Sequence, residues 1–252
     1  MDLLKEKDNI QLNDFIDSKF KALESHLSEV KLQNKELFKG MIFNNLIHNK
    51  DWIKNKEFIP TKGAATYSFL YILLIILDKI QPENILEFGL GQTTKLTTQY
   101  AKFKNPNCFL QTIDNDENWI NAMIAELPVS ENINIIKRDL ETFTLNNTKN
   151  DKYHNLQEVT KDTKYDLIII DGPFGFNRTY PRTNILDLIP QNLAQDFVII
   201  LDDAERDGEQ NTAKLIFEKL DENNIKYSKF YQHASKSQLI ITSDKYKFIS
   251  FY

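Results

Sequence analysis

The stretch from Ile85 to Thr94 constrains the fold of this chain more than any other. Its apolar run, 84–88, is followed by two glycines one residue apart and then by residues that can continue as a helix. A strand, a tight turn and a helix form the start of a nucleotide-binding α/β unit. Gly89 and Gly91 would let the backbone turn sharply and approach a ligand that a Cβ would exclude. The stretch therefore predicts a site for a small cofactor.

The residues around this turn narrow the choice of cofactor. A dinucleotide fingerprint needs a third glycine, and that place is held by Thr94. Glu87 would repel a pyrophosphate but suits a cationic ligand. The motif resembles the first motif of the class I S-adenosylmethionine-dependent methyltransferases, in which an acidic residue lies beside the methionine part of the cofactor. The resemblance implies a cofactor site at Glu87, Phe88, Gly89, Gly91, Thr93 and Thr94; a glycine turn of some other α/β protein remains the alternative.

Length and charge limit the function classes. A chain of 252 residues is long enough for one large α/β domain with an appendage. The net charge of −5 argues against a nucleic-acid partner. The single cysteine, Cys108, excludes a disulfide framework and is expected in the core. The N-terminus lacks a signal-peptide pattern, and the longest uncharged run is too short for a membrane helix, so we expect a cytoplasmic protein without a membrane span.

The first 58 residues differ from the rest and predict a helical extension ahead of an α/β domain at 59–252. Apolar residues recur there at three- and four-residue steps, at Leu12, Ile16, Phe20, Leu23, Leu27 and Val30, and then, after Gln33 and Asn34, at Leu37, Phe38, Met41, Ile42 and Leu46. The pattern indicates two amphipathic helices, each of which must pack on something. A cap on the chain's own domain, an arm for a homodimer and a substrate lid all remain open.

From residue 60 onward, helices and strands alternate. A helix is expected at 64–80, and strands at 84–88, 108–113, 133–136, 166–170 and 197–201. Runs that are apolar at every position belong to strands covered on both faces, so this sheet is predicted to be parallel. The last two strands, 227–231 and 239–242, are joined by too few residues for a parallel crossover. This order matches the Rossmann-like, seven-stranded sheet of class I methyltransferases: five parallel strands plus an antiparallel terminal hairpin.

Polar residues at the strand ends extend the predicted cofactor site. Asp114 ends the second strand, followed by Asn115. In the family, an acidic residue there accepts both ribose hydroxyls; a helix N-cap is a compatible alternative. Asp139 follows the third strand, where the resemblance implies a carboxylate near the adenine amino group, and a surface turn is the alternative.

Three carboxylates are expected to meet at the ends of the fourth and fifth strands. Asp171 follows one strand, and Asp202 and Asp203 follow the other. Such a group repels unless it is protonated or bridged by a cation, and Mg²⁺ or Mn²⁺ favours carboxylates. The pattern resembles metal-dependent sugar O-methyltransferases, which implies Asp171, Asp202 and Asp203 as metal ligands, Asp171, Asp203 and His233 as catalytic groups, and Asp171 also as a cofactor-binding residue at the methyl end of the cofactor. Alternatively, Asp202 caps a helix or pairs with Arg206, and Asp171 is a base without a metal.

Acceptor recognition is predicted from residues beyond Asp171. Arg178, Tyr180, Arg182 and Arg206 would lie at the rim, and arginine forks suit the phosphate of a nucleotide-linked sugar. Surface arginines paired with Glu205 or Glu209 are the alternative. An exposed loop position is the alternative for His233. The polar stretch 141–164 is expected to form a mobile flap.

These features together predict an S-adenosylmethionine-dependent O-methyltransferase. Resemblance alone suggests a sugar hydroxyl as the acceptor, such as a heptose on a nucleotide, in the synthesis of capsule or another surface polysaccharide. A small-molecule O-methyltransferase for a catechol is the nearest rival. From a different class, the chain could be a catalytically silent binding or scaffold subunit.

Overall fold

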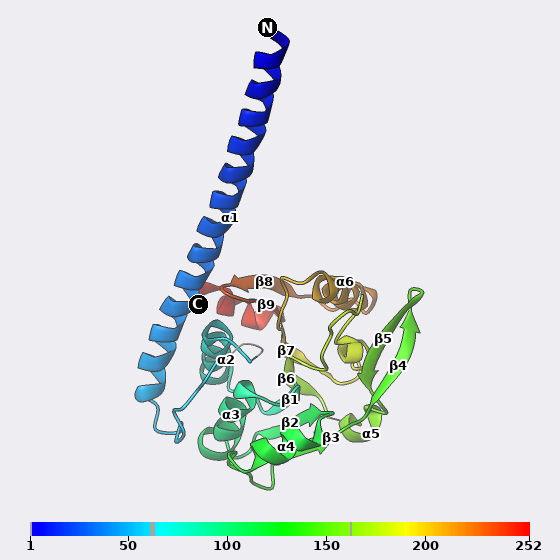
Figure 1. Cartoon of the computed structure of the whole chain (residues 1–252). Coiled ribbons are helices and arrows are strands. Elements are labelled where there is room, and N and C mark those ends of the chain that lie inside the picture. The colour runs from blue at the N-terminus through cyan, green and yellow to red at the C-terminus, as the bar shows by residue number, and fades with distance from the viewer. Residues whose placement is uncertain (1, 61–63, 162) are drawn as a thin grey trace.

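A seven-stranded sheet forms the centre of the computed structural model, which describes residues 2–60, 64–161 and 163–252, with side chains from residue 15 onward (Figure 1). In spatial order its strands are β3 (Ile133–Lys137), β2 (Phe109–Asp114), β1 (Asn84–Phe88), β6 (Tyr165–Ile170), β7 (Leu193–Leu201), β9 (Ser237–Thr242) and β8 (Ser228–His233). The first five strands are parallel, and β9 runs antiparallel to β7 and β8. The predicted Rossmann-like α/β sheet with a terminal antiparallel hairpin is confirmed.

The central strands are apolar at successive positions because both faces of the sheet are covered. Leu167 and Ile169 of β6 join one core, which includes α2 (Tyr67–Ile80) and α3 (Gln92–Gln99). Ile168 and Ile170 join the opposite core, which includes α6 (Asp207–Glu222). Cys108 is buried in the first of these cores, as predicted. A strand whose residues all enter a core reads as a continuous apolar run.

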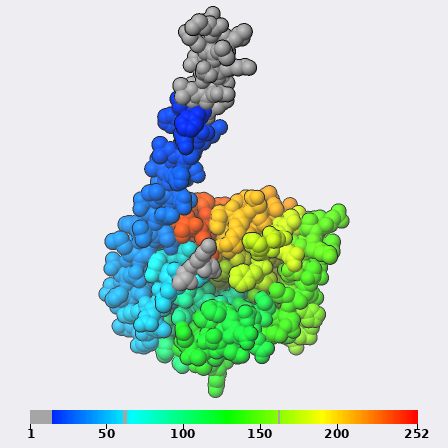
Figure 2. Space-filling model, viewed as in Figure 1, coloured from blue at the N-terminus to red at the C-terminus, as the bar shows by residue number. Residues whose placement is uncertain are grey.

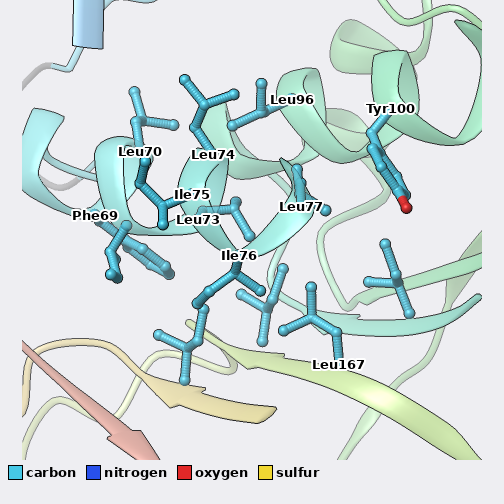
Figure 3. Packing of buried hydrophobic residues seen from close by; sticks show 14 of the residues in the cluster. Phe69, Leu70, Leu73, Leu74, Ile75, Ile76, Leu77, Leu96, Tyr100 and Leu167 are labelled. Carbon is cyan, nitrogen blue, oxygen red and sulfur yellow. The ribbon is translucent and has the colours of Figure 1, made fainter. Parts of the chain in front are cut away.

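Helix α2 is buried along most of its length. Residues 68–77 are all buried, and Figure 3 shows the helix between Leu167 of the sheet and Leu96 of α3. Burying one leucine or isoleucine side chain contributes roughly 1.5–3 kcal/mol, so this helix is a major part of the core. It begins at Tyr67, later than predicted, because Thr66 is its N-cap and accepts a hydrogen bond from the Phe69 amide.

The remaining elements are short. They are α4 (Glu117–Ile124), α5 (Gln157–Thr160), a π-helical turn at Tyr100–Lys104 and 3₁₀ segments at Thr183–Asp187 and Asp244–Phe251. No helix within the described ranges combines the length and the apolar character needed to cross a bilayer.

The polar stretch expected as a flap contains a β-hairpin of its own. Strands β4 (Leu140–Leu145) and β5 (Thr148–Tyr153) pair in an antiparallel ribbon apart from the main sheet. Asn146 and Asn147 form its two-residue turn with φ values of 48° and 62°. Asparagine tolerates this left-handed conformation, which two-residue hairpins favour. The sequence analysis missed this hairpin, although an Asn-Asn pair is a turn signal.

The N-terminal region is one helix, α1 (Asp2–His48), so the prediction of two helices was wrong. Gln33 and Asn34 do not break it, because neither residue removes a backbone donor as proline does. Near its C-terminal end α1 buries Phe43 and Ile47 in the core. Residues 15–31 are all exposed, and this part projects away from the body in Figures 1 and 2. Over that length α1 is not a cap on its own domain. The side chain of Leu12, from the predicted apolar stripe, lies outside the described residues.

Candidate active site

The turn after β1 requires glycine at its first position. Gly89 has a φ of +90°, and a Cβ there would lie 2.8 Å from the carbonyl oxygen of Asp171. Its amide donates to the carbonyl oxygen of Ile113 at 2.9 Å. The end of β1 is therefore held tightly between the ends of β2 and β6.

Gly91 differs from Gly89, because its backbone and its described surroundings would accept a side chain. Its φ of −176° is extended backbone that any residue adopts, yet a Cβ there would meet no described atom within 4 Å. Its amide donates to Thr94 Oγ1 at 2.9 Å, and both Thr93 and Thr94 are buried. Open space therefore lies beside Gly91 at the N-terminus of α3, where the missing side chain lets a ligand approach the backbone closely.

Asp114 ties the glycine turn to the end of β2. Its Oδ2 accepts from the Leu90 amide and its Oδ1 from the Asp116 amide, at 2.8 and 2.9 Å. The N-cap of α4 is Asp116, so the N-cap alternative for Asp114 is not observed. Each carboxylate oxygen has a second lone pair, so Asp114 can still accept from a ligand hydroxyl. Asn115 follows it and is partly exposed.

Glu87 is fully buried beneath the turn. Its Oε2 accepts hydrogen bonds from the hydroxyls of Thr112 and Thr97, at 2.9 and 3.2 Å. Burial raises the pKa of Glu87 to about 7, although the neighbouring threonine hydroxyls act in the opposite direction. Its Oε1 is buried and has no hydrogen-bond partner among the described residues, so it is an unsatisfied acceptor beneath the turn.

Tyr153, which the sequence analysis did not select, packs against the ends of β1 and β6. Its ring stacks on Phe88 with centroids 5.7 Å apart, and a Cβ at Gly172 would lie 2.8 Å from its hydroxyl. The hairpin β4–β5 thus contributes a buried side chain between the ends of β1 and β6. Asp139 is exposed and pairs with Lys137, which corresponds to the surface-turn alternative.

The three predicted aspartates do converge. One carboxylate oxygen from each of Asp171, Asp202 and Asp203 lies within 4.8 Å of the others. They meet because β6 and β7 are neighbours and end at the same edge of the sheet. Asp203 has a φ of 57°, a conformation uncommon outside glycine that recurs at functional sites.

Arg182 lies inside this cluster, so its predicted position at the surface rim was wrong. Its side chain is 3% exposed. It donates to the Asp202 carbonyl oxygen at 2.8 Å and to Asp203 Oδ2 at 2.7 Å. The loop after β6 turns inward here because the guanidinium offsets the charge of carboxylates that would otherwise repel one another.

Lys236, a second and partly buried cation, was missed by the sequence analysis. Its Nζ lies 3.0 Å from Asp203 Oδ1 and 3.6 Å from Asp202 Oδ2. Arg206 also reaches Asp203, at 2.8 Å, rather than its predicted partner Asp202. The predicted link between the last two strands contains Lys236, but nothing in its sequence indicates which residue faces inward.

The pKa values of Asp171 and Asp203 are shifted in opposite directions. Burial, followed by the charge of Asp202, raises the pKa of Asp171 well above its usual range. Burial acts in the same direction on Asp203, but Arg182, Lys236 and Arg206 outweigh it and lower the pKa of that carboxyl. Asp171 is therefore the stronger base, and Asp203 holds a fixed negative charge.

The other predicted rim residues lie outside the cluster. Arg178 pairs with Asp151 of the hairpin at 2.6 Å, whereas Glu209, an alternative partner in the prediction, lies 3.8 Å from both Arg182 and Arg206. The Tyr180 amide donates to Asn150 Oδ1, so both residues attach this loop to the hairpin. Phe174 and Phe176, which were not predicted, follow Asp171 by three and five residues and are each 87% exposed.

His233 is the exposed last residue of β8. Its ring stacks on Tyr231 with centroids 5.5 Å apart, and Nδ1 lies 2.8 Å from Ser237 Oγ. None of the hydrogen bonds or ion pairs of the described residues joins it to the three aspartates. His233 therefore has the exposed position that the sequence analysis gave as the alternative.

Comparisons with known proteins identify the fold. No protein-family model and no curated protein matches the sequence. A Staphylococcus aureus structure provisionally assigned as a caffeoyl-CoA O-methyltransferase has a TM-score of 0.50 and 17% identity over 82% of this chain and 100% of that one. The O-methyltransferase TomG of Streptomyces achromogenes, involved in tomaymycin synthesis and solved with S-adenosylmethionine, has a TM-score of 0.50 and 10% identity over 85% of this chain and 98% of its own. The chain has the class I methyltransferase fold.

In the class I methyltransferase fold, as in other open α/β sheets, ligands bind outside the carboxyl ends of the strands. Gly91, Asp114 and Asp171 follow or end β1, β2 and β6 at that edge. The open space beside Gly91 and the acidic cluster therefore belong to one region of this methyltransferase fold.

The acidic cluster also has a donor set suited to a divalent ion. Three carboxylates are available, and Asp202 Oδ2 has no hydrogen-bond partner among the described residues. Mg²⁺ and Mn²⁺ prefer such oxygens. However, Arg182 and Lys236 already supply positive charge to the same carboxylates. The cluster thus fits a hard cation and also carries cations of its own.

Proposed function

We propose that this chain is an S-adenosylmethionine-dependent O-methyltransferase that acts on a hydroxyl group of a small-molecule acceptor. The observation that carries the proposal is the open space beside Gly91, with Asp114 and the acidic cluster at the same edge of the sheet. The descriptions of the two structural neighbours as O-methyltransferases, one of them solved with S-adenosylmethionine, support it.

In this proposal Asp171 takes the proton of the acceptor hydroxyl. S-adenosylmethionine, when bound, supplies a methyl group on a positively charged sulfur. Asp171 is favoured as the base because its pKa is raised and its side chain is 19% exposed, against 3% or less for Asp202 and Asp203. Arg182 orients the carboxylate of Asp171 from 3.2 Å. His233, the other predicted base, is less favoured because it lies outside the cluster.

We further propose a sugar hydroxyl on a nucleotide-linked sugar, such as a heptose for capsule synthesis in the cytoplasm, as the acceptor. Arg206 supports a phosphate-bearing acceptor, because it is half exposed while its guanidinium reaches Asp203. Asp171, Asp202 and Asp203 would hold a divalent ion, which lowers the pKa of a bound hydroxyl towards neutrality. The capsule assignment rests on the sequence resemblance.

A catechol-like phenol is the second candidate acceptor. Phe174 and Phe176 favour it, because two exposed aromatic rings on the loop that follows Asp171 are available to stack on a planar ring. Sugars present apolar C–H faces to the same rings, so these residues do not exclude the first candidate.

Calorimetric titration with S-adenosylhomocysteine tests the cofactor. We expect micromolar binding to the wild-type chain and little binding to a Gly91→Leu variant, whose side chain would fill the open space. Absence of binding to the wild type would overturn the methyltransferase proposal and favour a scaffold subunit.

Methyl transfer to nucleotide sugars and to catechols, each with EDTA or with Mg²⁺, then tests the acceptor. Transfer to a sugar that requires the ion would support both finer proposals. Transfer to catechol alone would replace the sugar proposal, and full activity in EDTA would contradict the metal.

A further inference from the structure

We propose that two copies of this chain associate through α1 as a parallel, two-stranded coiled coil. This inference is independent of the proposed enzymatic activity. It concerns the exposed face of α1, which the catalytic proposal does not use.

The exposed face of α1 carries a heptad repeat. Steps of four and three residues assign Phe20, Leu27, Asn34 and Met41 to the a positions and Ile16, Leu23, Val30 and Leu37 to the d positions. The seven apolar residues of this set are 40–67% exposed. Because α1 is continuous, the a and d positions together form one seam along the helix. At 1.5 Å per residue, the seam from residue 16 to 41 extends ~38 Å. An apolar seam of this period is buried when a second helix supercoils around it.

The seam does not compete with the body for the same face of α1. Gly40, Phe43 and Ile47 are buried against the body, and Gly40 approaches the ring of Tyr67. With about 100° between successive residues, this buried face is centred roughly 105–135° around the helix from the seam. A partner helix can therefore contact the seam while each body lies to one side of it.

Asn34 selects the number and direction of the helices. The mixed apolar residues at a and d do not by themselves select a number of strands. A single asparagine at an a position faces its own counterpart only in a parallel, in-register pair, where the two amides can hydrogen-bond. Asn34 is exposed in the single chain and has this a position.

A charge pair supports the same direction. Lys19 has a g position and Glu24 the following e position, and in a parallel pair these positions face each other between helices. The two helices would form this pair twice, once on each side of the seam. In an antiparallel pair, g positions would instead face g positions, so Lys19 would not have Glu24 as its partner across the seam.

The mass of the full chain in solution tests the association. Light scattering or sedimentation equilibrium should give about twice the chain mass of 29.5 kDa. Leu23→Lys with Leu27→Lys should give a monomer, whereas the matched control Ser25→Lys with Ser28→Lys, off the seam on the same helix, should remain a dimer. All four residues are exposed, so both variants should keep the unfolding transition of the α/β body, although loss of the dimer should lower the stability of the exposed part of α1. A monomeric wild type, a trimer, or a dimeric seam variant would overturn the proposal.

Disulfide formation tests the direction. In a parallel pair Phe20→Cys should cross-link two chains under mild oxidation, because a residues face their counterparts. The native Cys108 is buried, so it gives no background. In an antiparallel seam residue 20 would face residue 37, leaving the two cysteines ~25 Å apart. A dimer that does not cross-link at this position would overturn the parallel arrangement; Ser25→Cys, off the seam, is the matched control.

Discussion

Arg182 and Asp203 form an ion pair at the centre of the candidate site, with Nη2 of Arg182 2.7 Å from Oδ2 of Asp203 and both side chains 3% exposed. The same nitrogen lies 3.2 Å from Oδ1 of Asp171. A single buried cation thus connects the loop after β6 with the residues that follow β7. The arrangement of the three carboxylates depends on it.

Replacing Arg182 should therefore destabilise the protein strongly. Arg182→Met would leave Asp203 buried with one fewer cation, and breaking a buried pair in this way costs about 3–5 kcal/mol. Urea unfolding measures the loss. Arg178→Met is the matched control, because its pair with Asp151 is partly exposed and such pairs contribute about 0–1 kcal/mol. Equal effects of the two substitutions would mean that the buried pair has no special role.

Mn²⁺ binding should depend on Asp202. This residue is fully buried and its Oδ2 has no hydrogen-bond partner among the described residues. We expect the wild type to bind Mn²⁺ in a calorimetric or electron paramagnetic resonance titration, and Asp202→Asn to lose most of that binding. If the wild type binds no ion, the cations Arg182, Lys236 and Arg206 neutralise the cluster.

Asp171→Asn should abolish methyl transfer while leaving cofactor affinity nearly unchanged. A positioned base contributes about 10²–10⁴-fold to the rate, and the amide cannot accept the hydroxyl proton. The turnover rate and the affinity for S-adenosylhomocysteine are measured on the same preparation. If His233→Gln lost activity while Asp171→Asn retained it, the histidine would be the base instead.

The sequence was sufficient to predict the sheet and the meeting of the aspartates. Strands such as β6 are apolar at successive positions, so their ends are visible in the sequence. Neighbouring parallel strands end at the same edge, and this alone brings Asp171 close to Asp202 and Asp203.

The cations of the cluster could not be predicted in the same way. Arg182 and Lys236 lie on segments without a repeating pattern, and the direction of a loop side chain depends on tertiary contacts. Tyr153 reaches Phe88 at the end of β1 because it lies on the β4–β5 hairpin, which the sequence analysis missed. The continuity of α1 was also missed, because the polar pair Gln33 and Asn34 was interpreted as the end of a helix.

Glu87 should make stability fall as the pH rises. Its pKa is raised from 4.5 to about 7, so the folded state favours the protonated carboxyl. The resulting stabilisation is complete below pH 4.5 and is lost as the pH rises through 7, a change of roughly 3 kcal/mol. Glu87→Gln should gain stability relative to the wild type by about this amount between pH 5 and pH 8. If the unfolding free energies of the two proteins changed equally with pH across that range, a buried, protonated Glu87 would be contradicted.

The two glycines of the turn should respond in opposite ways to an added side chain. Gly89→Ala forces a positive φ on alanine and a 2.8 Å contact with the Asp171 carbonyl, so the fold should lose stability. Gly91→Leu meets no described atom within 4 Å and should change unfolding free energy by less than about 1 kcal/mol. The leucine would fill the space beside the N-terminus of α3, so cofactor affinity should fall at least about tenfold, or 1.4 kcal/mol. Thermal unfolding and titration with S-adenosylhomocysteine on both variants separate these effects. A Gly91→Leu protein that is stable and still binds would show that the ligand lies elsewhere.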